Sequence, residues 1–143
     1  MRYKLLEKSM LKTSKITKDE IINFIETKCT EADEKKYAMY SSYIIIAHMI
    51  NEYTQAKDSL NLSRWLYKMD RHKRAKENPA YIINYFKGER YLECGDEVNA
   101  LKYLMLCYYE NPNYPFTRVA SCYKFLNANL DRPHKLPNEK VDE

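Results

Sequence analysis

The chain has 143 residues, 45% of them hydrophobic, which suits one domain with its own core and is too short for two comfortable domains. It contains two glycines and five prolines, so there is little turn material for a β-sheet, and we expect an all-α fold. The net charge of +4 is modest for a nucleic-acid-binding protein, and no apolar run approaches the roughly 18 residues of a membrane span.

The first segment, residues 1–16, is basic. Its leucines and methionines would suit a short docking helix. Glu7 and Lys12 interrupt the apolar region that a signal peptide needs. We therefore expect a cytoplasmic protein that makes no membrane contact.

Two capping boxes predict the first two helices of the folded region. Thr17 and Glu20 have the spacing of such a box and should open a helix that ends near Cys29. Thr30 and Asp33 have the same spacing and should open a longer helix directly afterwards.

A third helix should follow a break at residues 58–61. Four apolar residues recur there at helical spacing: Leu62, Trp65, Leu66 and Met69. Pro79 should close this helix. The hairpin of the second and third helices, at about residues 30–78, looks like a degenerate copy of the unit that follows it.

The most informative unit lies between residues 81 and 114. Gly88 falls in the middle of a predicted helix, where glycine costs about 1 kcal/mol relative to alanine, so a neighbouring helix should pack closely on its backbone. Gly95 suits a left-handed helix C-terminus, and Asp96 suits the N-cap of the next helix. The second helix should carry a buried stripe and end before Pro112. The stripe consists of Ala100, Leu104 and Cys107.

This pattern resembles the tetratricopeptide repeat (TPR), a helical hairpin of about 34 residues. The matching positions are Gly88, Tyr91, Gly95, Ala100, Leu104 and Pro112. Asn84 and Lys87 depart from the family pattern, because they stand where it has a bulky residue and a leucine. The resemblance implies a short right-handed TPR-like stack of about six helices in antiparallel hairpins.

The stack should occupy residues 17–128 as a single domain. Its sixth helix should be launched by residues 113–115 and should carry Phe116 and Leu126. The last segment, residues 129–143, is polar and broken by proline, and we expect it to be disordered.

The resemblance also implies which side chains meet a partner. In TPR proteins, ligand contacts commonly come from the first helix of each repeat, which gives Tyr85, Glu89 and Leu92 here, flanked by Tyr81 and Asn84. The set of side chains with which the family grips a terminal carboxylate is not reproduced, so no carboxylate clamp is predicted.

Two further features suggest interaction surfaces. The chain has 14 tyrosines, and Tyr108, Tyr109 and Tyr114 lie near a turn where one helix cannot bury them all, so they are candidates for a partner or homodimer surface. Most other tyrosines would simply line the core.

The second feature is basic. The positive residues Arg64, Lys68 and Arg71 fall on one helical face, which is predicted to project into solvent. They could meet phosphates or an acidic partner, or form an ordinary solvated face.

Few residues are candidates for catalysis, metal binding or disulfide formation. The four cysteines have no paired spacing, so buried reduced thiols are expected rather than a disulfide framework or a zinc site. His48 lies on an apolar stretch, and we predict that it is a core or groove residue. His72 could be imagined in a nuclease with Arg71 and Arg74, but consecutive helical residues point in different directions. We therefore predict no enzyme, no cofactor and no metal.

Three functions remain open. The leading hypothesis is a non-catalytic protein-binding module, specifically a bacterial immunity protein that neutralises a toxin of interbacterial competition. The second is a TPR-type chaperone or adaptor for a secreted protein, because the run from Pro112 to Cys122 is similar to the last-repeat entry of TPR secretion chaperones. The third is a nucleic-acid-binding regulator that uses the basic residues 64–76.

Overall fold

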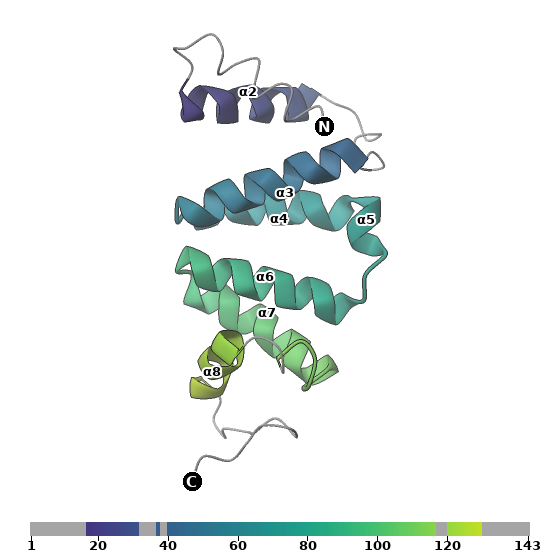
Figure 1. The fold of residues 1–143 in the computed structure, drawn as a ribbon, viewed down its shortest axis with the longest axis vertical. Helices are drawn as coiled ribbons and strands as arrows, with labels where there is room; N and C mark the ends of the chain where they lie inside the picture. Colours follow the sequence, from purple (N-terminus) through teal and green to yellow (C-terminus); the bar gives the residue numbers. More distant parts are fainter. Residues whose placement is uncertain (1–16, 32–36, 38–39, 117–119, 130–143) are drawn as a thin grey trace. The chain divides into compact units, whose positions relative to one another are not determined.

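A computed structural model describes residues 17–31, 37, 40–116 and 120–129. In these ranges the protein is all α-helical and contains no β-strand (Figure 1), which confirms the predicted fold class. The helices are α2 (Lys18–Glu31), α3 (Tyr40–Gln55), α4 (Ser59–Arg71), α5 (Lys73–Lys76), α6 (Ala80–Cys94), α7 (Glu97–Glu110) and α8 (Ala120–Ala128). None of these helices has both the length and the apolar composition that crossing a membrane requires.

The chain divides into two compact units, which are described separately. The first unit contains residues 1–52 and 64–77, and the second contains residues 53–63 and 78–143. The predictions for residues 1–16 and for the tail beyond residue 129 lie outside the described residues.

Three helices begin with the same kind of N-cap. The Glu20 N–H donates to Thr17 Oγ1 at 3.2 Å at the start of α2, as the capping box predicts. The Asn61 N–H donates to Asp58 Oδ1 at 3.2 Å at the start of α4, and the Asn99 N–H donates to Asp96 Oδ1 at 3.1 Å at the start of α7. Each cap satisfies a backbone N–H that the helix itself leaves unpaired.

The starts of α4 and α7 agree in further detail. In both helices the asparagine amide also donates to the second oxygen of the capping aspartate, at 2.7 Å. The residue before each aspartate is left-handed, with φ of 58° at Lys57 and 89° at Gly95. The two caps lie 38 residues apart in the chain.

Other positions of the two helix pairs, α3–α4 and α6–α7, also match at a spacing of 38 residues. Identical residues recur as Tyr43 and Tyr81, Ile44 and Ile82, Ile45 and Ile83, Tyr53 and Tyr91, Asp58 and Asp96, Asn61 and Asn99, and Leu66 and Leu104. Residues buried in both pairs are Tyr53 and Tyr91, Leu62 and Ala100, Leu66 and Leu104, and Met69 and Cys107. These matching positions lie 38 residues apart, a spacing longer than the roughly 34 residues of a TPR.

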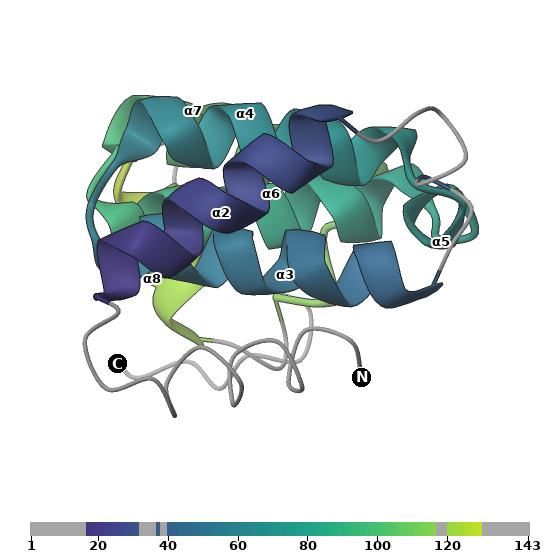
Figure 2. The same cartoon turned by 90° about the horizontal axis from the view of Figure 1, so that it is seen from above.

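In the first unit, α2 lies across α3 and α4 (Figure 2). Two ion pairs connect these helices: Lys18 Nζ lies 2.6 Å from the Glu52 carboxylate on α3, and Arg64 lies 3.0 Å from the Glu26 carboxylate on α2. Ile21 and Ile25 are buried on the apolar side of α2. This helix is therefore held by apolar contacts and by charges at its edges.

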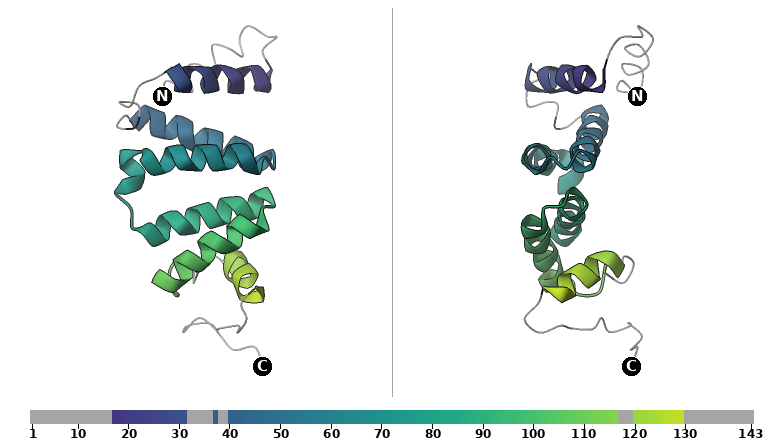
Figure 3. Two further views of the ribbon diagram at one scale, coloured as in Figure 1. Left: turned by 180° about the vertical axis from the view of Figure 1, so that it is seen from behind. Right: turned by 90° about the vertical axis from the view of Figure 1, so that its left-hand side faces the viewer.

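In the second unit, α6 and α7 run antiparallel and side by side (Figure 3). Gly88 allows this approach, because a Cβ built at this position would lie 2.6 Å from Leu104 Cγ. The turn closes when the Gly95 N–H donates to Leu92 O at 3.1 Å and the Asp96 N–H donates to Tyr91 O at 2.9 Å. The predicted roles of both glycines and of Asp96 are confirmed.

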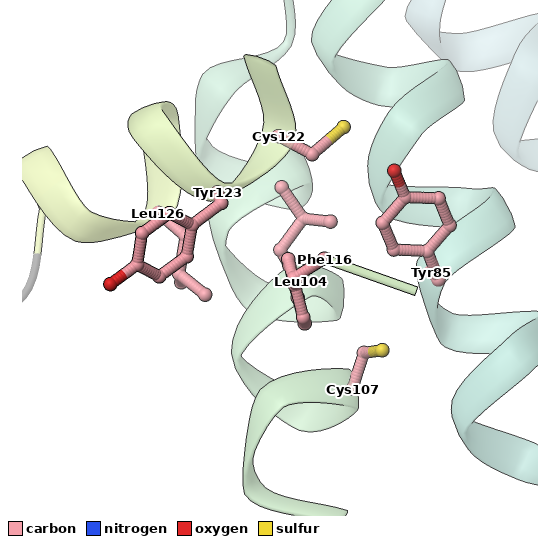
Figure 4. Packing of buried hydrophobic residues seen from close by; sticks show 7 residues of the cluster. All are labelled: Tyr85, Leu104, Cys107, Phe116, Cys122, Tyr123 and Leu126. Carbon is pink, nitrogen blue, oxygen red and sulfur yellow. The ribbon is translucent and has the colours of Figure 1, made fainter. Parts of the chain in front are cut away.

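The core of the second unit joins α6, α7, α8 and the turn before α8. Figure 4 shows Leu104 and Phe116 at the centre, with Tyr85 on one side and Tyr123 on the other. The rings of Tyr85 and Phe116 meet edge to face with centroids 5.5 Å apart. The cluster consists of Tyr85, Leu104, Cys107, Phe116, Cys122, Tyr123 and Leu126.

In the first half of the chain, the helices begin and end at other residues than the sequence predicted. Thr30 does not begin a helix, because it lies inside α2 and its hydroxyl donates to Glu26 O at 2.9 Å. The next helix, α3, begins at Tyr40, and Asp33 lies outside the described residues.

Two proline-related boundaries also differ from the prediction. Pro79 does not close the third helix but is the N-cap residue of α6, because α4 already ends at Arg71 and the short α5 follows. Residues 114–116, including Phe116, form a turn rather than the start of a helix, and the last described helix is α8, Ala120–Ala128. The predicted stop before Pro112 is confirmed, because α7 ends at Glu110.

Candidate protein-interaction surface

The outward side of α7 is apolar. Ala100, Leu104 and Cys107 are buried and define the inner side of this helix. A helix turns by about 100° per residue, so the opposite side carries a row that we call the outer stripe of α7. The outer stripe consists of Val98, Lys102, Leu106 and Tyr109.

Three of the four stripe residues are large exposed hydrophobic side chains. Val98 is 83% exposed, Tyr109 is 70% exposed and Leu106 is 46% exposed. Lys102 is exposed among them. Exposed apolar residues are ordinary when they are scattered, but a row of them along one helix is a candidate contact surface.

The flank of α7 between the stripe and the inner side is also apolar. Leu101, Met105 and Tyr108 are partly buried and pack against the core cluster of the second unit. Helix α7 is therefore apolar on almost every side, with charges only at Glu97, Lys102 and Glu110. A helix with this composition is typical of one that is covered all round.

The turn after α7 extends the exposed surface. Asn111 Oδ1 accepts the backbone N–H groups of Asn113 at 3.3 Å and of Tyr114 at 3.2 Å. The ring of Tyr108 packs on Phe116 with centroids 5.9 Å apart and is partly buried, whereas Tyr109 and Tyr114 are exposed. Of the three tyrosines predicted near this turn, Tyr109 and Tyr114 are therefore the exposed ones.

The predicted ligand contacts on α6 lie mostly on the side of that helix that faces α7. Tyr85 is buried in the core cluster, and Tyr81 and Leu92 pack against it. They share this side because they lie at helical spacing from Gly88, where α7 makes its closest approach. These three side chains offer little surface.

The two polar members of the predicted α6 set, Asn84 and Glu89, are half-buried. Contact of α6 with a partner stays a prediction, which Asn84 and Glu89 are best placed to fulfil.

Burial also suppresses the chemistry of this core. Burial is the main cause that raises the pKa of Tyr85, whose hydroxyl lies beside the Cys122 thiol. Burial likewise raises the pKa of the Cys107 thiol to about 12, so this cysteine remains a neutral thiol at physiological pH. Cys94, Cys107 and Cys122 are free and buried, as predicted, and Cys29 is half-buried.

The predicted basic stripe is held by contacts within the first unit. Arg64 is exposed but pairs with Glu26 at 3.0 Å. Lys68 lies over the Trp65 ring at 5.3 Å and is half-buried. Arg64 thus projects into solvent as predicted, although it is paired, whereas Lys68 is only partly exposed.

Arg71 is engaged in the same way. Its guanidinium lies 4.5 Å from the centre of the Tyr37 ring, and its Nη1 donates to the Tyr37 hydroxyl at 3.5 Å. Three further positive charges, Lys73, Arg74 and Lys76, are exposed on α5, and the Arg74 guanidinium lies 6.0 Å from the centre of the Tyr43 ring.

His72 has a structural role that the sequence analysis missed. It is fully buried, and its Nδ1 accepts the Arg74 N–H at 3.1 Å, so it caps α5. Its Nε2 lies 3.3 Å from Ser42 Oγ, and because Nδ1 accepts a hydrogen bond, the neutral ring donates from Nε2. Residues 71–76 are mostly basic, and their sequence contains no local signal for this cap.

The outer stripe of α7 was also missed, although the sequence contains a signal for it. The prediction for this helix covered only the buried stripe through Leu104 and left the opposite side unassigned. A count of charged residues would have indicated the second apolar side, because α7 has only three in 14 residues.

Within the described ranges, no group of three or more His, Cys, Asp or Glu side chains could hold a metal ion. Comparison of the chain with protein-family models, with curated proteins and with solved structures finds no match.

Proposed function

We propose that the chain is a protein-binding module and that it docks its partner on the outer stripe of α7. One observation carries this proposal: Val98, Leu106 and Tyr109 are exposed in a row on a helix whose opposite side is already packed in the core. Burying such side chains against a partner gains roughly 25 cal/mol per Å² of apolar area, before the costs of association.

The composition of the stripe favours a protein as the partner. Tyr109 supplies a large, stiff side chain with a hydrogen-bonding hydroxyl, which is typical of the residues that dominate protein interfaces. A single charge, Lys102, lies among the apolar residues, and this depletion of charge is typical of an interface centre.

We further propose that the two helix pairs are repeats of a TPR-like helical stack. The positions that match at a spacing of 38 residues, the shared caps at Asp58 and Asp96, and the shared buried positions support this arrangement. Contacts within the second unit link successive repeats: Ser63 Oγ lies 2.6 Å from the Tyr91 hydroxyl, and the Ser59 hydroxyl donates to Asp96. Helical repeats present side chains on extended surfaces that suit protein partners.

The narrower roles predicted from the sequence differ in the identity of the partner. An immunity protein would hold a toxin on the outer stripe and inactivate it, whereas a chaperone would hold a secreted protein. The third hypothesis, nucleic-acid binding, is weakened because Arg64 and Arg71 are engaged with Glu26 and Tyr37.

The test uses a stripe variant and a matched control. Leu106→Lys with Tyr109→Arg places charges on the outer stripe, and Tyr67→Lys changes an exposed aromatic residue on α4 instead. The tagged chains are used for affinity purification from an extract of the source organism at high salt. The captured protein is then purified, and its affinity for each chain is measured. We expect binding by the wild type and by Tyr67→Lys but at least tenfold weaker binding by the stripe variant.

Two results would contradict the proposal. One is equal affinity of the stripe variant and the wild type for the purified partner. The other is retention of nucleic acid alone, lost at high salt, which would favour the basic residues of α5.

A further inference from the structure

We propose that, in the free protein, a second copy of this chain covers the outer stripe of α7, with the two α7 helices antiparallel. This inference rests on the proposed function, because it uses the same outer stripe of α7, and it specifies a second copy of the chain as the protein that covers the stripe. It predicts a symmetric homodimer in which both copies contribute the same side chains.

The charges on the outward half of α7 favour this occupant. Lys102 and Glu110 are both exposed and lie eight residues apart, with Leu106 midway between them. Eight residues make about two turns of helix, so the two charges project on neighbouring sides of the stripe about 12 Å apart along the axis. Lys102 in the stripe and Glu110 beside it are thus opposite charges at equal distances along the helix from Leu106.

This arrangement is self-complementary only when the helices are antiparallel. If a two-fold axis passes beside Leu106, Lys102 of each copy comes opposite Glu110 of the other, and two ion pairs form. In a parallel pair, Lys102 would face Lys102 and Glu110 would face Glu110, and like charges would repel. The charge pattern therefore selects the antiparallel pair.

The apolar residues fit the same arrangement. Leu106 meets its own counterpart at the axis, and Tyr109 lies next to it in each copy. Val98 is two turns of helix from Leu106 and so reaches the end of the other α7, where the exposed Tyr114 follows in the turn. All the large exposed hydrophobic residues of α7 and of the turn after it thereby become covered.

The experiment measures the mass of the full chain by light scattering and sedimentation over a range of concentrations. The monomer has a mass of 17.2 kDa, and we expect the wild type to reach twice this value. Leu106→Lys with Tyr109→Arg should remain a monomer, and a circular dichroism spectrum like that of the wild type with a cooperative melting transition would show that it folds. The Tyr67→Lys control should dimerise like the wild type.

Charge reversal tests the antiparallel arrangement itself. Lys102→Glu and Glu110→Lys should each weaken the dimer on the order of tenfold, because each places like charges together. The double variant should restore the affinity of the wild type, because the pairs re-form with their signs exchanged. A wild type that is monomeric at all concentrations overturns the inference, and so does a double variant that is no tighter than either single variant.

The two proposals fail in different ways. A monomeric wild type whose partner binding still depends on Leu106 and Tyr109 overturns the dimer alone. A dimeric wild type that binds no other protein through the stripe overturns the proposed function alone.

Discussion

Helices α4 and α7 are equivalent in how they begin and in what they bury, yet their outward sides differ. Each begins at an aspartate N-cap with an asparagine three residues later, and each buries a leucine at the same position, Leu66 or Leu104. At the outward positions of α4 stand Leu60, Arg64, Lys68 and Arg71, and at the equivalent positions of α7 stand Val98, Lys102, Leu106 and Tyr109. The predicted basic stripe and the apolar outer stripe therefore occupy the same places on two related helices.

This comparison separates the requirements of folding from those of binding. Caps and buried leucines are shared because both helices need them in order to form and pack. The outward positions tolerate arginine and lysine on α4, so the fold does not require leucine and tyrosine on α7. Their presence on α7 supports the proposal that this side contacts a second protein.

The largest expected effect tests whether the shared core positions are equivalent. Leu66→Ala and Leu104→Ala should each lower the free energy of unfolding by about 2–5 kcal/mol, because each leaves a cavity in a packed core. Urea denaturation followed by circular dichroism measures both. A loss below about 1 kcal/mol at either position would break the equivalence of the two helices.

The second effect tests a difference between the helix pairs. Gly88 stands where the first pair has the buried Ile50. Gly88→Ala should lower the free energy of unfolding by about 1–3 kcal/mol despite the higher helix propensity of alanine, because the new Cβ would clash with Leu104. Gly95→Ala is the control, since its Cβ would meet nothing within 4 Å and only the left-handed backbone would cost about 1 kcal/mol.

The third effect concerns the caps. Asp96→Ala should lower the free energy of unfolding by about 1–2 kcal/mol at pH 7, and Asp58→Ala by about 1 kcal/mol. We expect the larger loss at Asp96 because its carboxylate also accepts the Ser59 hydroxyl. Equal losses would show that this additional contact contributes nothing.

The loss at Asp96 should also depend on pH. Burial alone would raise the pKa of this carboxyl, but hydrogen bonds from Ser59 and Asn99 outweigh burial and hold the pKa below its ordinary value. The carboxylate therefore stabilises the fold fully above the ordinary pKa of about 3.9, and this contribution is lost as the pH falls through the lowered pKa. The difference between the wild type and Asp96→Ala should shrink below about pH 4 in urea denaturation at a series of pH values.

The smallest effect on stability comes from exchanging the outward residues themselves. Leu106→Lys and Tyr109→Arg give α7 the residues that α4 carries as Lys68 and Arg71. At a concentration where the wild type is monomeric, each should change the free energy of unfolding by no more than about 0.5 kcal/mol, because exposed positions contribute little to folding. A loss above about 2 kcal/mol would mean that the stripe serves the fold and would remove the argument for a binding surface.

Local features of the fold could be predicted from the sequence, because their causes lie within a few residues. Gly95, Asp96 and Pro112 act on their own turns of the chain, and each has the predicted role. Thr30 shows the limit of this reasoning. It has the residue types and spacing of a cap, but α2 continues through it and its hydroxyl bonds back to Glu26.

The surfaces were harder to predict, because they depend on contacts between residues that are far apart in the sequence. Arg64 and Arg71 are engaged by Glu26 and Tyr37, which lie 38 and 34 residues earlier in the chain. Tyr85 was assigned to a partner but is covered by Phe116. No periodic pattern within one helix reveals such neighbours.

The buried thiols give the protein an internal reporter of its own opening. Cys94, Cys107 and Cys122 all belong to the second unit, and burial raises the pKa of each thiol. A thiol reagent can modify them only when that unit opens, whereas the half-buried Cys29 belongs to the first unit. The rates of alkylation of the three buried cysteines, followed by mass spectrometry of peptides, thus report the local stability of the second unit, with the half-buried Cys29 as an internal reference for the reactivity of a more accessible thiol.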